Sequence, residues 1–176
     1  MTIIVAVRDA HKQETWIASD TMATQGDTLM YGASKWVVRK PWAAAIAGDY
    51  RAMNVLAAHA DDIMSGLSGA YDFTLRMRGA LIDDGFNSDQ EDGPKGYGTD
   101  FILAHPGGVW AISQAFSIVE IPDNEVWADG SGRAYGLGAA HACNGSPKQK
   151  VQAAVKAAIR YSDGCGGEVR VQKLKT

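Results

Sequence analysis

Cysteine, histidine and positive charge are all scarce in this sequence of 176 residues. Cys143 and Cys165 are the only cysteines, and the four histidines are scattered without the spacing of a zinc site. A secreted scaffold held by disulfides would need more cysteines, so we expect a reducing cytoplasm. The net charge of −3 predicts no basic face for nucleic acid. The sequence therefore argues against a metallohydrolase, a disulfide-rich module and a nucleic-acid-binding protein.

Long apolar runs are also missing. No stretch reaches the roughly 18 apolar residues that a membrane helix requires, so we expect no membrane association. The apolar run at the start is short and ends at Arg8-Asp9, which is unlike a signal peptide. What is present is a hydrophobic fraction of 46% over a length that suits one compact core. Without a linker or an internal repeat, residues 1–176 are predicted to form a single domain.

The periodicity of apolar residues changes along the chain from a strand pattern to a helix pattern and back. This order favours two stacked antiparallel sheets with a pair of helices over each outer face, an α+β fold, over a doubly wound parallel sheet. Strands are expected at 2–8, 15–19, 35–38, 42–47, 101–104, 109–112, 117–121 and 169–174. Helices are expected at 50–64, 72–82, 134–143 and from Ser146-Pro147 to about 162. Residues 21–32 are expected to form a loop or a bent ribbon, and residues 87–98 a loop.

Thr2 directly follows the initiator methionine and opens the apolar run that ends at Val7. Threonine is small enough for Met1 to be removed, which would leave one residue with both a nucleophilic hydroxyl and a free amine. An α-amine with a reference pKa of about 7.7–8.0 can accept the hydroxyl proton near neutral pH. By itself the position is also compatible with an ordinary residue of a first strand, and the downstream residues decide between the two interpretations.

Residues 20–32 closely resemble the segment that follows the first hairpin in HslV, the bacterial relative of the proteasome β subunit. Further similarity lies in the opening strand, in Ile46-Ala47-Gly48 and in Gly130-Ser131-Gly132. The resemblance to these N-terminal nucleophile hydrolases implies a four-layer α-β-β-α sandwich. It also implies threonine peptidase activity in a homo-oligomeric ring or stacked rings, on peptides or unfolded proteins that an unfoldase ATPase can deliver. The matching residues of the segment are Asp20, Ala23, Thr24, Gly26, Thr28, Met30 and Gly32.

The resemblance also implies catalytic roles for three groups. Thr2 would be the nucleophile, with Asp20 and Lys35 as its charged neighbours. A partly desolvated ammonium on Lys35 would favour negative charge on Thr2 during attack. Asp20 would keep Lys35 charged and hold it in position. Singly, Asp20 could be a turn residue and Lys35 a solvated surface residue, but their combination with the matched segment favours catalysis.

Four further positions complete the predicted site. The backbone amide of Gly48 is the candidate oxyanion donor, and Thr24 and Gly48 would offer backbone groups to an extended substrate. Ser131 and Asp163 resemble the polar pair that supports the terminal amine, although a helix cap and a turn are equally compatible with them. Cys165 falls near the place of a serine in the family pattern.

No cofactor or catalytic metal is expected, although the loop at 163–167 can bind a sodium ion in HslV-like proteins. Two other functions stay open on the same scaffold. One is a small-molecule amidase that acts without ring assembly. The other is a ring subunit that has lost activity, against which the joint presence of Thr2, Asp20 and Lys35 argues.

Overall fold

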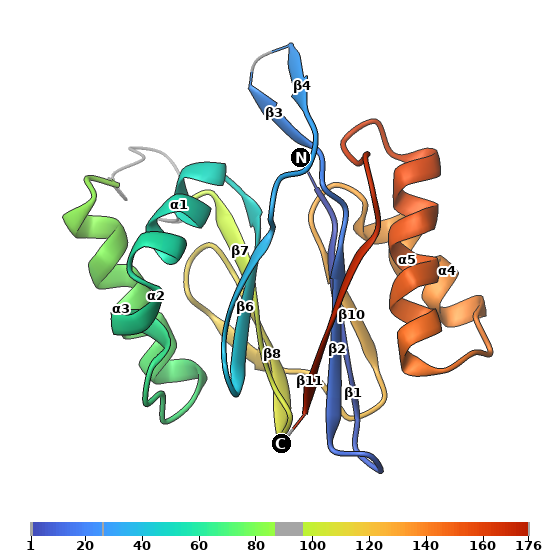
Figure 1. The fold of residues 1–176 in the computed structure, drawn as a ribbon, viewed down its shortest axis with the longest axis horizontal. Coiled ribbons are helices and arrows are strands. Elements are labelled where there is room, and N and C mark those ends of the chain that lie inside the picture. Colours follow the sequence, from blue (N-terminus) through green and yellow to red (C-terminus); the bar gives the residue numbers. More distant parts are fainter. Residues whose placement is uncertain (1, 26, 87–96, 176) are drawn as a thin grey trace.

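The computed structural model describes residues 2–25, 27–86 and 97–175, which form two antiparallel sheets packed face to face. Four strands make one sheet in the order β10-β1-β2-β11, and five make the other in the order β5-β6-β7-β8-β9. A separate ribbon, β3-β4, projects from one end of the sandwich (Figure 1). The strands are Ile4–Asp9 (β1), Glu14–Ser19 (β2), Ala23–Gln25 (β3), Thr28–Met30 (β4), Trp36–Arg39 (β5), Trp42–Gly48 (β6), Thr99–His105 (β7), Gly108–Ile112 (β8), Ile118–Glu120 (β9), Val126–Asp129 (β10) and Arg170–Lys175 (β11).

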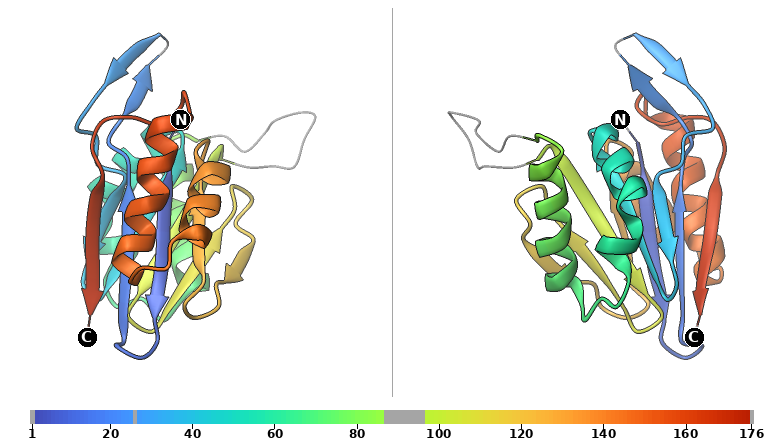
Figure 2. Two further views of the ribbon diagram at one scale, coloured as in Figure 1. Left: turned by 90° about the vertical axis from the view of Figure 1, so that its right-hand side faces the viewer. Right: turned by 60° about the vertical axis from the view of Figure 1, so that its left-hand side comes forward.

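Helices cover the outer face of each sheet, which makes four layers (Figures 1 and 2). The first three pack on the five-stranded sheet and the last two on the four-stranded sheet. They are Tyr50–Ala58 (α1), Ala60–Met64 (α2), Ala70–Asp83 (α3), Arg133–Ala142 (α4) and Pro147–Tyr161 (α5). The predicted α-β-β-α sandwich is thereby confirmed.

Both faces of the central strands are buried, because each sheet contacts helices on one side and the other sheet on the other. Along β1, Ile3, Val5 and Val7 face α4 and α5, while Ile4 and Ala6 face the second sheet. Much of the layer between the sheets is alanine, including three alternate residues of β6. Small side chains there allow the two sheets to approach closely.

The two ends of the sandwich differ. We call the end that carries the β3-β4 ribbon and the start of the chain the upper end, and the end with the β1-β2 turn at residues 10–13 the lower end (Figure 1). The start of β1, the end of β6 and the turn between β10 and α4 all lie at the upper end. The lower end holds the turn at 106–107 and the end of β11.

Most predicted elements occur in the structure, with two corrections. The helix predicted over 50–64 is interrupted at His59, whose φ of −107° and ψ of 22° separate α1 from α2. Strand β10 was not predicted, because its four residues, three apolar and then Asp129, are too few for a clear alternation. The loop predicted at 87–98 falls mostly outside the described residues. Among the described helices, none is long and apolar enough to span a membrane.

Candidate active site

Thr2 and Asp20 meet at the upper end because β1 and β2 form an antiparallel hairpin. The pairing of Ile4 with Ser19 leaves the residues before β1 and after β2 side by side. Thr2 Oγ1 donates to Asp20 Oδ1 at 2.5 Å, and the backbone N–H of Ile3 donates to the same oxygen at 3.1 Å. Oδ2 of Asp20 accepts from two further backbone N–H groups, those of Met22 at 3.3 Å and Gly166 at 3.1 Å. Four donors therefore hold this fully buried carboxylate in place.

Lys35 lies next to this pair and is also buried, with 4% of its surface exposed. Its Nζ donates to the carbonyl oxygen of Met22 at 2.6 Å. Burial lowers the pKa of Lys35, and the nearby Asp20 and Cys165 partly oppose this effect. In the described part of the chain no ion pair joins Lys35 to Asp20, so the Met22 carbonyl, and not Asp20 as we expected, holds the ammonium in position. Asp20 acts on Lys35 through its charge alone.

Gly48 ends β6 in a conformation that requires glycine. Its φ is +133°, and a Cβ atom there would lie 2.1 Å from the carbonyl oxygen of Gly98. Two residues earlier, the N–H of Ile46 donates to the carbonyl of Lys35 at 2.9 Å. Alternate N–H groups of a strand point to the same edge, so the N–H of Gly48 points to the same edge of β6 as the N–H of Ile46. This edge lies on the side of Lys35, beyond the start of β5. The N–H of Asp49 points the other way, to Gly98 O at 3.2 Å.

The turn between β10 and α4 wraps around the backbone of Thr2. Ser131 Oγ lies 3.2 Å from the Thr2 nitrogen, from which it accepts, and 3.3 Å from the Thr2 carbonyl oxygen, to which it donates. The Gly132 N–H donates to the same carbonyl at 3.3 Å. Gly130 has a φ of +94°, and a Cβ atom there would lie 2.3 Å from this carbonyl oxygen. The turn thus needs glycine for close approach and positions Ser131 against the nitrogen of Thr2.

The loop after α5 brings Cys165, not Asp163, to the site. Asp163 is exposed, and within the described ranges no hydrogen bond connects its side chain to Thr2 or Ser131. Cys165 is buried, and its Sγ lies 3.9 Å from Ser131 Oγ. Burial and the charge of Asp20 raise the pKa of this thiol. The sequence had indicated that Cys165 falls near the place of a serine in the family pattern. Nothing in the sequence indicated the contact of the Gly166 amide with Asp20.

A cavity of about 410 Å³ opens beside Lys35, between the β3-β4 ribbon and the start of α1. Three predicted site residues, Thr24, Lys35 and Gly48, line it. The rest of its wall comes from Ala23, Met30, Asp49, Tyr50, Arg51 and Asn54. The site therefore combines a buried hydroxyl, carboxylate and ammonium with an open space large enough for a side chain.

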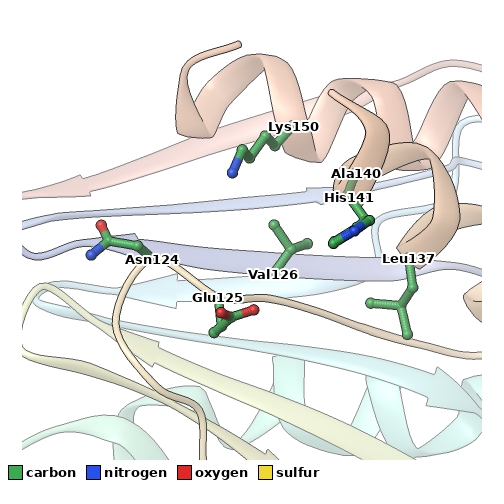
Figure 3. Close-up of a pocket in the computed structure, with 7 residues that line it drawn as sticks. All are labelled: Asn124, Glu125, Val126, Leu137, Ala140, His141 and Lys150. Carbon is green, nitrogen blue, oxygen red and sulfur yellow. The ribbon is translucent and has the colours of Figure 1, made fainter. Parts of the chain in front are cut away.

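A different cavity, of about 300 Å³, lies between α4, the start of α5 and the segment that leads into β10 (Figure 3). Polar side chains line it, including those of Glu125, His141 and Lys150 (Figure 3). None of the predicted site residues takes part in it. Within the described ranges, no three His, Cys, Asp or Glu residues gather as a possible metal site.

No protein-family model and no curated protein match this sequence. Solved structures do match it along nearly its whole length. BPH from Thiobacillus denitrificans has a TM-score of 0.80 at 19% identity, with 99% of this chain and 98% of that chain covered. Its complex with epoxomicin has a TM-score of 0.78, at the same identity and coverage. Eukaryotic HslV from Trypanosoma brucei has a TM-score of 0.71 at 15% identity, with 99% and 100% covered. The chain therefore has the fold of HslV.

Proposed function

We propose that this protein is an N-terminal threonine peptidase of the proteasome and HslV type, which hydrolyses peptide bonds through an acyl-enzyme on Thr2. The observation that carries the proposal is the set of groups around Thr2. Its Oγ1 lies 2.5 Å from a carboxylate oxygen of Asp20, and its nitrogen lies 3.2 Å from Ser131 Oγ. The buried ammonium of Lys35 and the Gly48 N–H on the same side would add the charge and the donor that acyl transfer requires.

The reaction depends on removal of Met1, because the Thr2 nitrogen is a peptide nitrogen until then. The freed amine takes the hydroxyl proton as Oγ1 attacks the substrate carbonyl carbon. The carbonyl oxygen becomes an oxyanion that the Gly48 N–H stabilises, while Lys35 favours the negative charge that develops near Thr2. The same amine then gives its proton to the leaving nitrogen, and the scissile bond breaks. An ester on Thr2 remains, which water hydrolyses after losing a proton to the amine.

Asp20 and Ser131 have positioning roles in this proposal. Asp20 accepts from the hydroxyl of Thr2 and keeps Oγ1 aligned before attack. Ser131 orients the nitrogen that acts as base. The backbone of Thr24 and Gly48 would pair with an extended substrate by strand addition, which places a side chain in the cavity beside Lys35. Asp163 has no assigned step, since its side chain is exposed.

We further propose that the protein acts in the cytoplasm as a homo-oligomeric ring, on peptides or on unfolded chains supplied by an unfoldase ATPase. Exposed apolar side chains on both helical layers support an assembly. Tyr71, Leu75 and Ile82 form a stripe along α3, with 69%, 54% and 50% of their surfaces exposed. Tyr135 and Tyr161 form an exposed aromatic pair on α4 and α5 with ring centres 6.1 Å apart.

Three measurements test the proposal. Intact mass of the purified protein should show the loss of Met1, and retention of Met1 in all molecules would rule out the mechanism. Thr2→Ala should reduce hydrolysis of peptidyl-aminocoumarin substrates to background, whereas Thr2→Ser should keep measurable turnover because it retains the hydroxyl. Full activity of Thr2→Ala would place the chemistry elsewhere.

Light scattering should report a multi-subunit ring, while Thr2-dependent hydrolysis by a monomer would favour a small-molecule amidase.

A further inference from the structure

A third cavity, of about 250 Å³, opens between the two sheets at the upper end. Its walls come from the upper ends of β7, β8, β9 and β10 and from the first residue of α4. The polar residues among them are Asp100, Ser113, Ser117, Trp127, Asp129 and Arg133. No step of the proposed mechanism uses any of these side chains.

The strand register places this cavity close to the nucleophile. Ile4 of β1 pairs with Asp129 of β10, and Ile4 faces the space between the sheets. Thr2 lies two residues before Ile4 and therefore on the same face of β1, diagonally opposite Asp129. Such diagonal neighbours are about 7–8 Å apart, which is the span of one or two residues of an extended peptide. Asp100 faces the same space from the other sheet, since Ile102 and Ala104 do so along β7.

The polar groups of the cavity leave negative charge in excess. Asp100 and Asp129 contribute two carboxylates and Arg133 one guanidinium, which lies 4.5 Å above the Trp127 ring. One oxygen of each carboxylate accepts from a backbone N–H, that of Gln114 for Asp100 and that of Gly130 for Asp129. Burial and the charge of Asp129 raise the pKa of Asp100, and the N–H of Gln114 and the charge of Arg133 only partly offset this. The carboxylates thus lack a full counter-charge.

An unpartnered donor in the same wall points to a bound group as well. The indole Nε1 of Trp127 is buried and has no hydrogen-bond partner among the described residues. A buried N–H without an acceptor is costly, and a bound peptide whose carbonyl reached Nε1 would relieve that cost. A peptide residue with a cationic side chain supplies both the positive charge and the acceptor.

The proposed acyl-transfer reaction indicates which part of a substrate would reach this cavity. The leaving nitrogen must take its proton from the Thr2 amine, which Ser131 holds. Asp129 and Arg133 lie two residues before and two residues after Ser131, so the cavity that they line is next to the base and within reach of the leaving peptide. We propose that the cavity between Asp100 and Asp129 binds the first or second residue after the cleaved bond and favours lysine or arginine there. This inference rests on the proposed peptidase function.

The test uses internally quenched peptides that are identical on the acyl side and carry Lys, Leu or Glu at the two positions after the cleaved bond. We expect the wild type to cleave the Lys peptide about tenfold faster, in kcat/KM, than the Leu peptide, and the Glu peptide more slowly still. Asp100→Asn and Asp129→Asn should each reduce the ratio of Lys to Leu, and the double variant should bring it close to one. Glu120→Gln removes an exposed carboxylate from β9 on the opposite face of Val119, which lines the cavity, and should leave the ratio unchanged.

A second measurement does not depend on turnover. Calorimetry should show that the peptide Lys-Ala-Ala binds the wild type more tightly than Leu-Ala-Ala does, and that the double variant loses the difference. If the ratios and the binding difference are the same in the wild type and the double variant, the subsite proposal is wrong even though cleavage proceeds. If no peptide is cleaved in a Thr2-dependent manner, the proposed function fails, and the binding difference alone then decides whether the cavity recognises a basic residue.

Discussion

Each end of the space between the two sheets contains a buried cation, but the two cations are paired in different ways. At the lower end, Arg8 donates from Nε to the carbonyl of Pro106 at 2.8 Å, from Nη2 to Gln13 at 3.0 Å, and from Nη1 to the carboxylate of Asp123. At the upper end, the ammonium of Lys35 donates to the Met22 carbonyl, its single acceptor within the described ranges.

This difference separates a structural charge from a reactive one. The planar guanidinium of Arg8 connects three loops and finds an acceptor for each nitrogen, so its burial stabilises the lower end. Lys35 retains donors that no protein group satisfies in the described structure, and burial lowers its pKa. A charge held in this way is available to stabilise negative charge on a substrate, at a cost to the stability of the fold.

The largest effect is expected from Lys35→Met. Loss of the ammonium should reduce peptide turnover by about 10²- to 10³-fold, because a preorganised charge next to the nucleophile is removed. The free energy of unfolding should instead rise slightly, by under about 1 kcal/mol, since removal of a poorly paired buried cation outweighs the loss of one donor to the Met22 carbonyl. Activity assays and urea unfolding measure the two quantities. Lys156→Met, at an exposed position on α5, is the control and should change neither. A large loss of stability in Lys35→Met would contradict the proposed contrast.

Arg8→Met should have the opposite pattern. We expect the free energy of unfolding to fall by about 2 kcal/mol, because the Pro106 carbonyl loses its donor and Asp123 its partner. Turnover per folded molecule should not change, since Arg8 lies near the end of β1 whereas Thr2 precedes its start. The matched control is Arg39→Met, which breaks an exposed pair with Asp61 and should cost well under about 1 kcal/mol. Equal losses in the two arginine variants would show that burial of Arg8 is not decisive.

The smallest effect concerns the pH dependence of stability. Lys35 has a lowered pKa in the folded protein, whereas in the unfolded chain it titrates near 10.5. Between these two pKa values the unfolded chain binds more protons, so the stability of the wild type should rise with pH relative to Lys35→Met. The advantage of Lys35→Met at neutral pH should therefore shrink as the pH approaches 10.5. Urea unfolding at several alkaline pH values measures this difference, and a gap that stays constant would argue against a desolvated ammonium.

The sequence predicted the layers of the fold because its strong patterns reflect burial. β1, β6 and β7 are apolar on both faces, and α5 begins at Ser146 with the predicted proline and a capping box to Gln149. It did not predict β10, although this strand carries the turn that holds Thr2. Four residues with no clear alternation become a strand only because β1 offers an edge for them to pair with.

In the candidate site too, some residues were predicted from the sequence and others were found only in the structure. Thr2, Asp20, Lys35, Gly48 and Ser131 were all proposed from the sequence, through its resemblance to HslV, and the structure brings them together. Which backbone groups complete the site was decided only by tertiary structure. The Met22 carbonyl anchors Lys35, the Gly166 amide holds Asp20, and Cys165 approaches Ser131 in preference to Asp163. Peptide groups are chemically alike at every position, so only the register of the strands and the path of the loops determine which of them reach the site.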